Sequence, residues 1–196
     1  MQHGFIKVAA ATPAIRVADP AYNAASCVAL AEAAAAVGTK LLVLPELCLT
    51  GSTCGDLYSH DRLITGAKEA LQSFAAETAH LDLVSVIGLP VAVGDQLYNC
   101  AAVVCGGAVL GLLPKTNLTP VERRTFSAPP AEVLVTDILG DGSFVQMGIK
   151  KLFVCSSLPS LRFAVEVGQD RNAATPPSAQ AVSAGAVIVC NPSATP

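Results

Sequence analysis

The sequence predicts an α/β fold in which a mixed β-sheet is covered by helices. In the N-terminal half, short apolar runs alternate with two helical stretches, which gives the order β-α-β-α-β. In the middle of the chain, several apolar runs follow one another closely, as antiparallel strands do. Apolar residues make up 52% of the 196 residues and charged residues 14%. This composition is typical of a single domain with a large buried core.

The first elements are two strands with a helix between them. Residues Phe5–Ala10 and Lys40–Leu44 are short apolar runs, which we interpret as buried strands. The helix is predicted over 19–36, since an Asp cap followed by a proline begins it. Its Ala-rich sequence carries few charges, so we expect burial of much of its surface, and Gly38 suits its C-terminal end.

A longer amphipathic helix is predicted from about His60 to His80. Its apolar face consists of Leu63, Ala67, Leu71 and Phe74. Strands then follow in quick succession, and the predicted ranges are 83–89, 97–104, 109–113, 133–135, 152–155, 161–167 and 186–190. We expect a Pro/Thr-rich loop over 114–130 and a short helix over 176–184.

Charge and hydropathy argue against nucleic-acid and membrane partners. The net charge is −3, and Arg123–Arg124 is the most basic stretch, which is less than a nucleic-acid-binding face needs. The longest weakly charged run, 100–113, is too short to span a bilayer and contains a Gly-Gly turn. The N-terminus lacks the pattern of a signal peptide. We therefore expect a soluble cytoplasmic protein.

The cysteines suggest packing roles in a reducing compartment. There are seven of them, an odd number without any CxxC pair, which favours free thiols over a disulfide framework. The three histidines lie far from any paired-cysteine spacing, so we do not expect a metal site.

Two ionisable residues directly follow predicted strands. Glu46 comes just after the strand 40–44, and Lys115 comes just after the strand 109–113. Active sites of open α/β sheets gather at the carboxyl ends of strands. A partly buried glutamate there can act as a general base, and a lysine can stabilise an oxyanion. Each residue also has a simpler interpretation, because Glu46 could be bonded to loop amides and Lys115 could be a solvated loop lysine.

A third loop at the end of a predicted strand has the sequence VEVGQD, residues 165–170. It would complete a constellation with Glu46 and Lys115 if it held a nucleophile. Position 168 is a glycine, which suits a tight turn and a close backbone approach but cannot attack a substrate.

Several segments in the same order carry a resemblance to a known family. They are KVAAATPAIRVAD, LLVLPELCLTGSTCGDL, LYNCAAVV, GLLPKTNL, VEVGQD and TPPSAQAVSAGAVIVCNPSAT. Together they resemble the glutaminase domain of glutamine-dependent NAD synthetases, which belongs to the nitrilase, or carbon–nitrogen hydrolase, superfamily. The resemblance covers nearly the whole chain.

The resemblance implies a nitrilase-like α-β-β-α sandwich. Residues 1–196 would be a single carbon–nitrogen hydrolase domain that is incomplete at its C-terminus, and the synthetase domain would be absent. The family uses a Glu-Lys-Cys triad. Glu46 matches the general base and Lys115 the residue that stabilises the intermediate, while the cysteine attacks the side-chain amide of glutamine to form a thioester.

Partners and cofactors are also implied by the resemblance. The released ammonia would pass to an ammonia-dependent NAD synthetase domain, a ligase that uses ATP to amidate an adenylylated nicotinate dinucleotide (deamido-NAD). ATP and deamido-NAD would belong to that absent domain, and no cofactor is expected in this one. A homo-oligomer is expected, because members of the superfamily commonly pair.

The sequence departs from the family pattern around the substrate pocket. Gly168 occupies the position of the nucleophile, and Gln169 replaces an acidic neighbour. The other pocket positions are Ser52 where a tyrosine is usual, Asn172 where an aromatic is common, Glu122 at the end of an altered pocket loop, and Thr195 where a serine is expected.

These departures predict that the chain does not hydrolyse amides. Cys48 and Cys54 are expected to pack, and Cys190 is the nearest candidate for a replacement nucleophile. We interpret the chain as a disabled glutaminase domain, a pseudoenzyme. Two alternatives stay open, namely a non-catalytic binding or scaffold domain and a truncated gene product with poor solubility.

Overall fold

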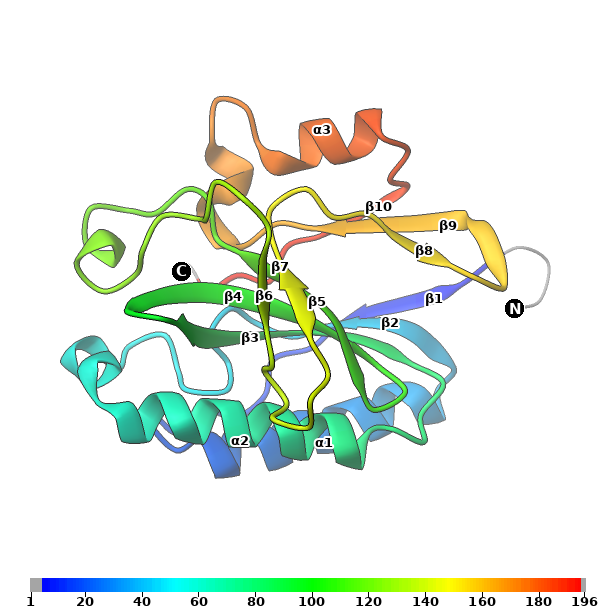
Figure 1. Cartoon of the computed structure of the whole chain (residues 1–196). Coiled ribbons are helices and arrows are strands. Elements are labelled where there is room, and N and C mark those ends of the chain that lie inside the picture. Colours follow the sequence, from blue (N-terminus) through cyan, green and yellow to red (C-terminus); the bar gives the residue numbers. More distant parts are fainter. Residues whose placement is uncertain (1–4, 195–196) are drawn as a thin grey trace.

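Two β-sheets packed face to face between helices form the fold (Figure 1). The structure is a computed structural model that describes residues 5–194. Its layers, from bottom to top in Figure 1, are helices α1 and α2, a large sheet, a small sheet and helix α3. The expected α-β-β-α sandwich is therefore confirmed.

The large sheet has seven strands among the described residues, in the order β1-β2-β3-β4-β5-β7-β6. β1, β2 and β3 are parallel, β3 to β5 are antiparallel, and β7 lies parallel to β5 with β6 antiparallel to it. The strands are β1 (Lys7–Ala10), β2 (Thr39–Val43), β3 (Val84–Val93), β4 (Gln96–Cys105), β5 (Ala108–Pro114), β6 (Leu134–Thr136) and β7 (Val145–Met147).

Helices α1 (Pro20–Ala36) and α2 (Asp61–Glu77) cover one face of this sheet (Figure 1). Asp19 begins α1 as predicted, since its side chain accepts a hydrogen bond from the Tyr22 N–H. All four apolar positions predicted for α2 are buried. Leu71 and Phe74 pack with α1 and the sheet into the main core, whereas Leu63 belongs to a smaller cluster with Tyr58.

The small sheet covers the other face and has three strands in the described part of the chain, in the order β10-β9-β8. They are β8 (Phe153–Cys155), β9 (Leu158–Val165) and β10 (Ile188–Cys190), and helix α3 (Pro177–Ser183) lies outside them. A second apolar core fills the space between the sheets, where Leu41 and Val103 of the large sheet meet Phe163 and Val165 of β9.

Short 3₁₀ turns and loops join the layers. The 3₁₀ turns are η1 (Gly55–Ser59), η2 (Glu122–Arg124) and η3 (Gly168–Asn172). The predicted loop began at 114, but Pro114 is the last residue of β5, and most of 115–130 carries no other regular element. None of the helices in residues 5–194 is long and apolar enough to cross a bilayer.

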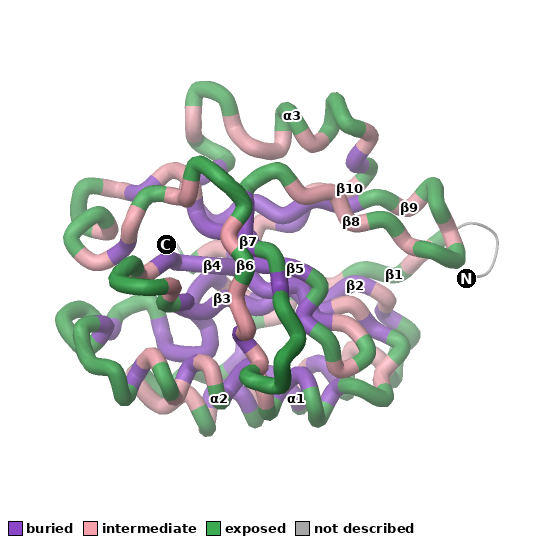
Figure 2. The backbone as a smooth tube through the Cα atoms, viewed as in Figure 1, coloured by how far each residue is buried: buried purple, intermediate pink, exposed green. Residues whose placement is uncertain are grey.

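Three predictions about strands were wrong in part. β1 is an edge strand with three of its four residues exposed, whereas we expected a buried strand. β7 was missed, because its three residues, just before Gly148, carry too little periodicity to be read as a strand. Figure 2 shows the buried strands in the middle of the sandwich and exposed chain around β6 and β8. The sequence pattern alone also indicated one sheet, and the structure has two.

Candidate active site

The candidate active site lies where three strands end. Glu46 follows β2 by three residues, Lys115 follows β5 directly, and Gly168 follows β9. The turn that carries Glu46 lies directly on β3, because Gly88 has no side chain. A Cβ atom at Gly88 would overlap the backbone at Pro45 and Leu47. The sandwich thus brings loops from both sheets to one place.

Glu46 and Lys115 form a buried ion pair. Their side chains are 4% and 2% exposed, and the Lys115 Nζ lies 2.7 Å from the Glu46 Oε1. A second carboxylate, Glu122 in η2, holds the same Nζ at 2.5 Å. Burial to this extent excludes the interpretation of Lys115 as a solvated loop lysine. Glu46 accepts a loop amide, the Ala194 N–H at 3.3 Å, in addition to the ion pair.

The ion pairs shift the pKa values of two of these groups. Burial works to lower the pKa of Lys115, but the carboxylates of Glu122 and Glu46 outweigh it and raise that pKa above the ordinary lysine value. Burial works to raise the pKa of Glu122, but Lys115 and the Thr119 amide outweigh it and lower that pKa. Lys115 is therefore a permanent cation at neutral pH, held between carboxylates.

Glu122 is fixed by a capping box. Its Oε2 accepts the Thr119 N–H at 2.8 Å, and its own N–H donates to the Thr119 Oγ1 at 3.3 Å. This reciprocal T-x-x-E pairing is the local pattern that begins a helical turn. η2 is thereby held with the Glu122 carboxylate directed at Lys115.

Gly168 directly faces the ion pair. Its φ is +51°, in the left-handed region that favours glycine. A Cβ atom at Gly168 would overlap the Glu46 Oε2 and lie 3.1 Å from the Lys115 Nζ. The Gly168 N–H donates to the Pro192 carbonyl at 2.8 Å, which anchors the turn. A side chain at position 168 would therefore contact both charged groups. Because the residue is glycine, no side chain from this turn contacts the ion pair.

Asp170 connects the position 168 turn to the Lys115 loop. It is 1% exposed. Its Oδ1 accepts the Thr116 N–H at 2.8 Å and the Asn117 N–H at 2.6 Å, and its Oδ2 accepts the Val167 N–H at 3.0 Å. Asp170 belongs to the VEVGQD segment, but no role was predicted for it. An aspartate two residues after a glycine, in a loop at the end of a predicted strand, was the available signal.

A cleft of about 580 Å³ opens beside Glu46. The expected pocket residue Ser52 lies on its wall, as do Thr53, Ser193 and Ala194. Gln169 instead bonds to its own turn, since its Oε1 accepts the Asn172 Nδ2 at 2.5 Å. Thr195 lies outside the described residues. Of the predicted pocket side chains, Glu122 belongs to the ion-pair network and Ser52 to the cleft.

The three cysteines considered in the sequence analysis, Cys48, Cys54 and Cys190, are buried thiols, and Cys48 also lines the cleft beside Glu46. Cys190 is 3% exposed in the core between the sheets, where burial raises the pKa of its thiol to about 12. Burial also raises the thiol pKa values of Cys48 and Cys54. A thiol with a raised pKa is mostly protonated at neutral pH and is a weak nucleophile.

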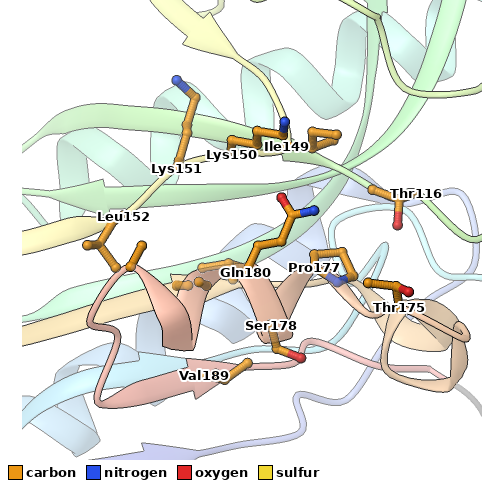
Figure 3. A pocket seen from close by; sticks show the side chains of 14 residues that line it. Thr116, Ile149, Lys150, Lys151, Leu152, Thr175, Pro177, Ser178, Gln180 and Val189 are labelled. Atoms are coloured by element: carbon orange, nitrogen blue, oxygen red, sulfur yellow. The ribbon is translucent and has the colours of Figure 1, made fainter.

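A second cavity of about 360 Å³ lies apart from the ion pair, between α3 and the chain leading into β8 (Figure 3). Ile149, Leu152 and Val189 give it a largely apolar wall, and Gln180 of α3 extends into the gap toward Ile149. Within residues 5–194, no group of three or more His, Cys, Asp or Glu side chains is placed to hold a metal ion.

The two facing sheets between helices, with the polar site at their strand ends, define a nitrilase-like α/β domain. The chain belongs to the carbon–nitrogen hydrolase family, whose sequence model matches residues 7–192. It is 38% identical over 199 aligned positions to the glutamine-dependent NAD(+) synthetase of Mycobacterium tuberculosis, covering all of this chain and 29% of that protein. The chain thus spans less than a third of this curated relative.

Solved structures agree with the fold. A glutamine-dependent NAD(+) synthetase from Cytophaga hutchinsonii matches with a TM-score of 0.80 and 26% identity, over 97% of this chain and 30% of the other. An amidase from Nesterenkonia matches with a TM-score of 0.72, over 98% of this chain and 66% of the other. Its identity of 20% supports a likeness of fold alone.

Proposed function

We propose that this chain is a glutaminase-type domain that has lost its nucleophile and does not release ammonia from glutamine as it stands. The observation that carries the proposal is the position of Gly168. A side chain there would meet both the Glu46 Oε2 and the Lys115 Nζ. The base and the cation are thus retained, and the group that they would serve is missing.

The retained pair fits amide hydrolysis through a thiol at position 168. The Glu46 Oε2 would take the thiol proton, and the sulfur would attack the amide carbonyl. The Lys115 ammonium would stabilise the oxyanion, ammonia would leave with a proton from Glu46, and water would hydrolyse the thioester. With hydrogen at position 168, the first bond of this sequence cannot form.

The names of the relatives support glutamine as the substrate class. The Mycobacterium tuberculosis and Cytophaga hutchinsonii proteins are glutamine-dependent NAD(+) synthetases. A solved structure of the Nesterenkonia amidase carries acrylamide added at an active-site cysteine. In this proposal the partner is an ammonia-dependent NAD synthetase domain, which would hold ATP and deamido-NAD, and this domain needs no cofactor.

A binding role without chemistry is the second candidate, and the open cleft beside Glu46 favours it. The cleft retains hydroxyl groups from Ser52 and Thr53 near the buried carboxylate. Such a site could hold a small amide without cleaving it. Calorimetric titration of the chain with glutamine tests this role, and heat of binding without ammonia release would support it.

The test of lost catalysis is ammonia release from glutamine by three substitutions at one position, Gly168→Cys, Gly168→Ser and Gly168→Ala. All three place a Cβ atom against Glu46 and in a left-handed backbone, so they share a strain of about 1–2 kcal/mol. The cysteine variant alone gains a thiol. We expect activity in Gly168→Cys and none in Gly168→Ala or in the chain as found.

Thermal unfolding of the three variants separates lost folding from lost chemistry. Activity in the chain as found would contradict the proposal, because another nucleophile would then be at work. A folded but inactive Gly168→Cys would assign the loss to the altered pocket and would favour the binding role.

A further inference from the structure

We infer that Asn99 is a positioning residue, which holds one oxygen of the Glu46 carboxylate so that the other oxygen faces position 168. The inference rests on the proposed function, because it assigns to Glu46 the role of base toward a group at that position. Asn99 lies in β4, opposite Pro90 of β3, and is 1% exposed.

Asn99 contacts both charged members of the site. Its Nδ2 donates a hydrogen bond of 2.7 Å to the Glu46 Oε1. Its backbone carbonyl accepts the Lys115 N–H at 2.8 Å. A single strand residue therefore orients the base with its side chain and anchors the lysine with its main chain.

The two oxygens of Glu46 have different surroundings. Oε1 receives two short bonds of 2.7 Å, one from Asn99 and one from the Lys115 Nζ. Oε2 receives a longer bond of 3.3 Å from the Ala194 N–H, and it is the oxygen that a Cβ at position 168 would meet. Oε2 is thus the oxygen available to accept a proton from a side chain at that position.

Among residues 5–194, the side-chain amide of Asn99 makes a hydrogen bond through its Nδ2 and none through its oxygen. Within the described part of the chain, its Oδ1 is buried and has no hydrogen-bond partner. A buried acceptor without a partner costs free energy, and a leucine would fill a similar volume without that cost. The asymmetry indicates that the role of Asn99 in the site is the bond that its Nδ2 makes to Glu46.

The first test uses the introduced thiol as a reporter. In the Gly168→Cys background, Asn99→Leu should slow alkylation of that thiol by iodoacetamide at neutral pH and change its pH profile, because the base no longer faces it. Mass spectrometry of the peptide containing position 168 separates it from other cysteines. Where Gly168→Cys is active, kcat should fall about 100-fold with little change in KM, as expected for a misplaced catalytic group.

Asn23→Leu is the matched control. Asn23 is fully buried, but its Nδ2 donates hydrogen bonds to the Arg16 and Leu49 carbonyls and makes none to Glu46 or Lys115. Its loss should lower the thermal midpoint and leave the pH profile of alkylation unchanged. An Asn99→Leu variant that behaves like this control would overturn the inference and assign Asn99 a structural role.

The alkylation test also separates this inference from the proposed function. If a folded Gly168→Cys releases no ammonia, the loss of activity is assigned to the altered pocket and the binding role is favoured, yet the effect of Asn99→Leu on alkylation can still be measured. If Gly168→Cys does not fold, the alkylation test is replaced by a crystal structure of the Asn99→Leu variant that keeps Gly168. We expect the Glu46 carboxylate to rotate there, and an unchanged Glu46 would refute the inference.

Discussion

At the scale of single residues, the site is held by one cation shared between two carboxylates. Lys115 is buried between Glu46 and Glu122, with distances of 2.7 and 2.5 Å. Removing one partner of such a group leaves an uncompensated buried charge, which is costly. The network therefore couples the stability of the fold to the protonation of the site.

The first prediction concerns pH. The pKa of Glu122 is lowered in the folded state, so its contribution to the free energy of unfolding is complete above the ordinary value of about 4.3 and is lost as pH falls through the folded value. The pKa of Lys115 is raised. Its contribution is complete below about 10.4 and is lost as pH rises through the folded value.

Urea unfolding across the pH range measures both effects. Glu122→Gln should flatten the acidic side of the stability curve, whereas Glu132→Gln in an exposed loop should leave it as it is. An acidic side unchanged by Glu122→Gln would show that the Lys115–Glu122 pair does not contribute to stability.

The polar residues at the strand ends were predictable from the sequence. The residues that hold them in place by hydrogen bonds were not. The positions of Glu46, Lys115 and Gly168 follow from local patterns read one segment at a time. Asn99 and Asp170 act through partners that lie 53 and 54 residues away along the chain. No local pattern specifies such a partner, although a single asparagine within an apolar strand was a visible signal.

At the scale of elements, the contact between β3 and the turn after β2 decides where Glu46 lies. Gly88 lets the turn rest directly on the strand, and the Leu49 N–H donates to the Gly88 carbonyl at 3.2 Å. A side chain at this point would separate the two segments and displace Glu46 with them. Strand interiors seldom favour glycine, so its presence here marks the close approach.

Gly88→Ala should therefore destabilise the fold by roughly 1–3 kcal/mol or more, because the clash is with backbone atoms. The matched control is Gly66→Ala within α2, whose Cβ would lie in ordinary contact with Pro20 at 3.4 Å. That change should stabilise the chain by about 0.5–1 kcal/mol. Denaturant unfolding measures both, and equal effects of the two alanines would contradict this account of Gly88.

Helices were easier to predict from the sequence than strands. The apolar spacing in α2 and the Asp-Pro start of α1 are local signals, and the helices formed where these signals lie. β6, β7 and β8 have three residues each, and periodicity is weak over so short a run. The division into two sheets depends on pairing between distant segments, and it was implied by the family resemblance alone.

At the scale of the whole molecule, apolar side chains remain on the surface along the β6 edge of the large sheet. Val133 and Val135 are each 56% exposed and Phe144 is 73% exposed. β6 ends the sheet, and Figure 2 shows exposed chain around it. An uncovered apolar edge strand favours pairing with another copy, in line with the expectation of a homo-oligomer.

We therefore predict that Val135→Lys reduces self-association, because a charge on an edge strand opposes pairing. Val37→Lys is the control, since Val37 is similarly exposed but lies at the C-terminal end of α1 and not in β6. Sedimentation velocity over a range of concentrations should show a smaller species for Val135→Lys. Identical sedimentation of the two variants would exclude the β6 edge as the contact.

The left-handed backbone at Gly168 has a consequence for evolution. A nucleophile in that conformation is maintained by selection for activity against its own cost in folding, about 1–2 kcal/mol for any residue with a Cβ. Once selection for the reaction is relaxed, a mutation to glycine is favoured by stability alone. The reverse mutation lowers the stability of the fold, so a domain with glycine at this turn tends to keep it.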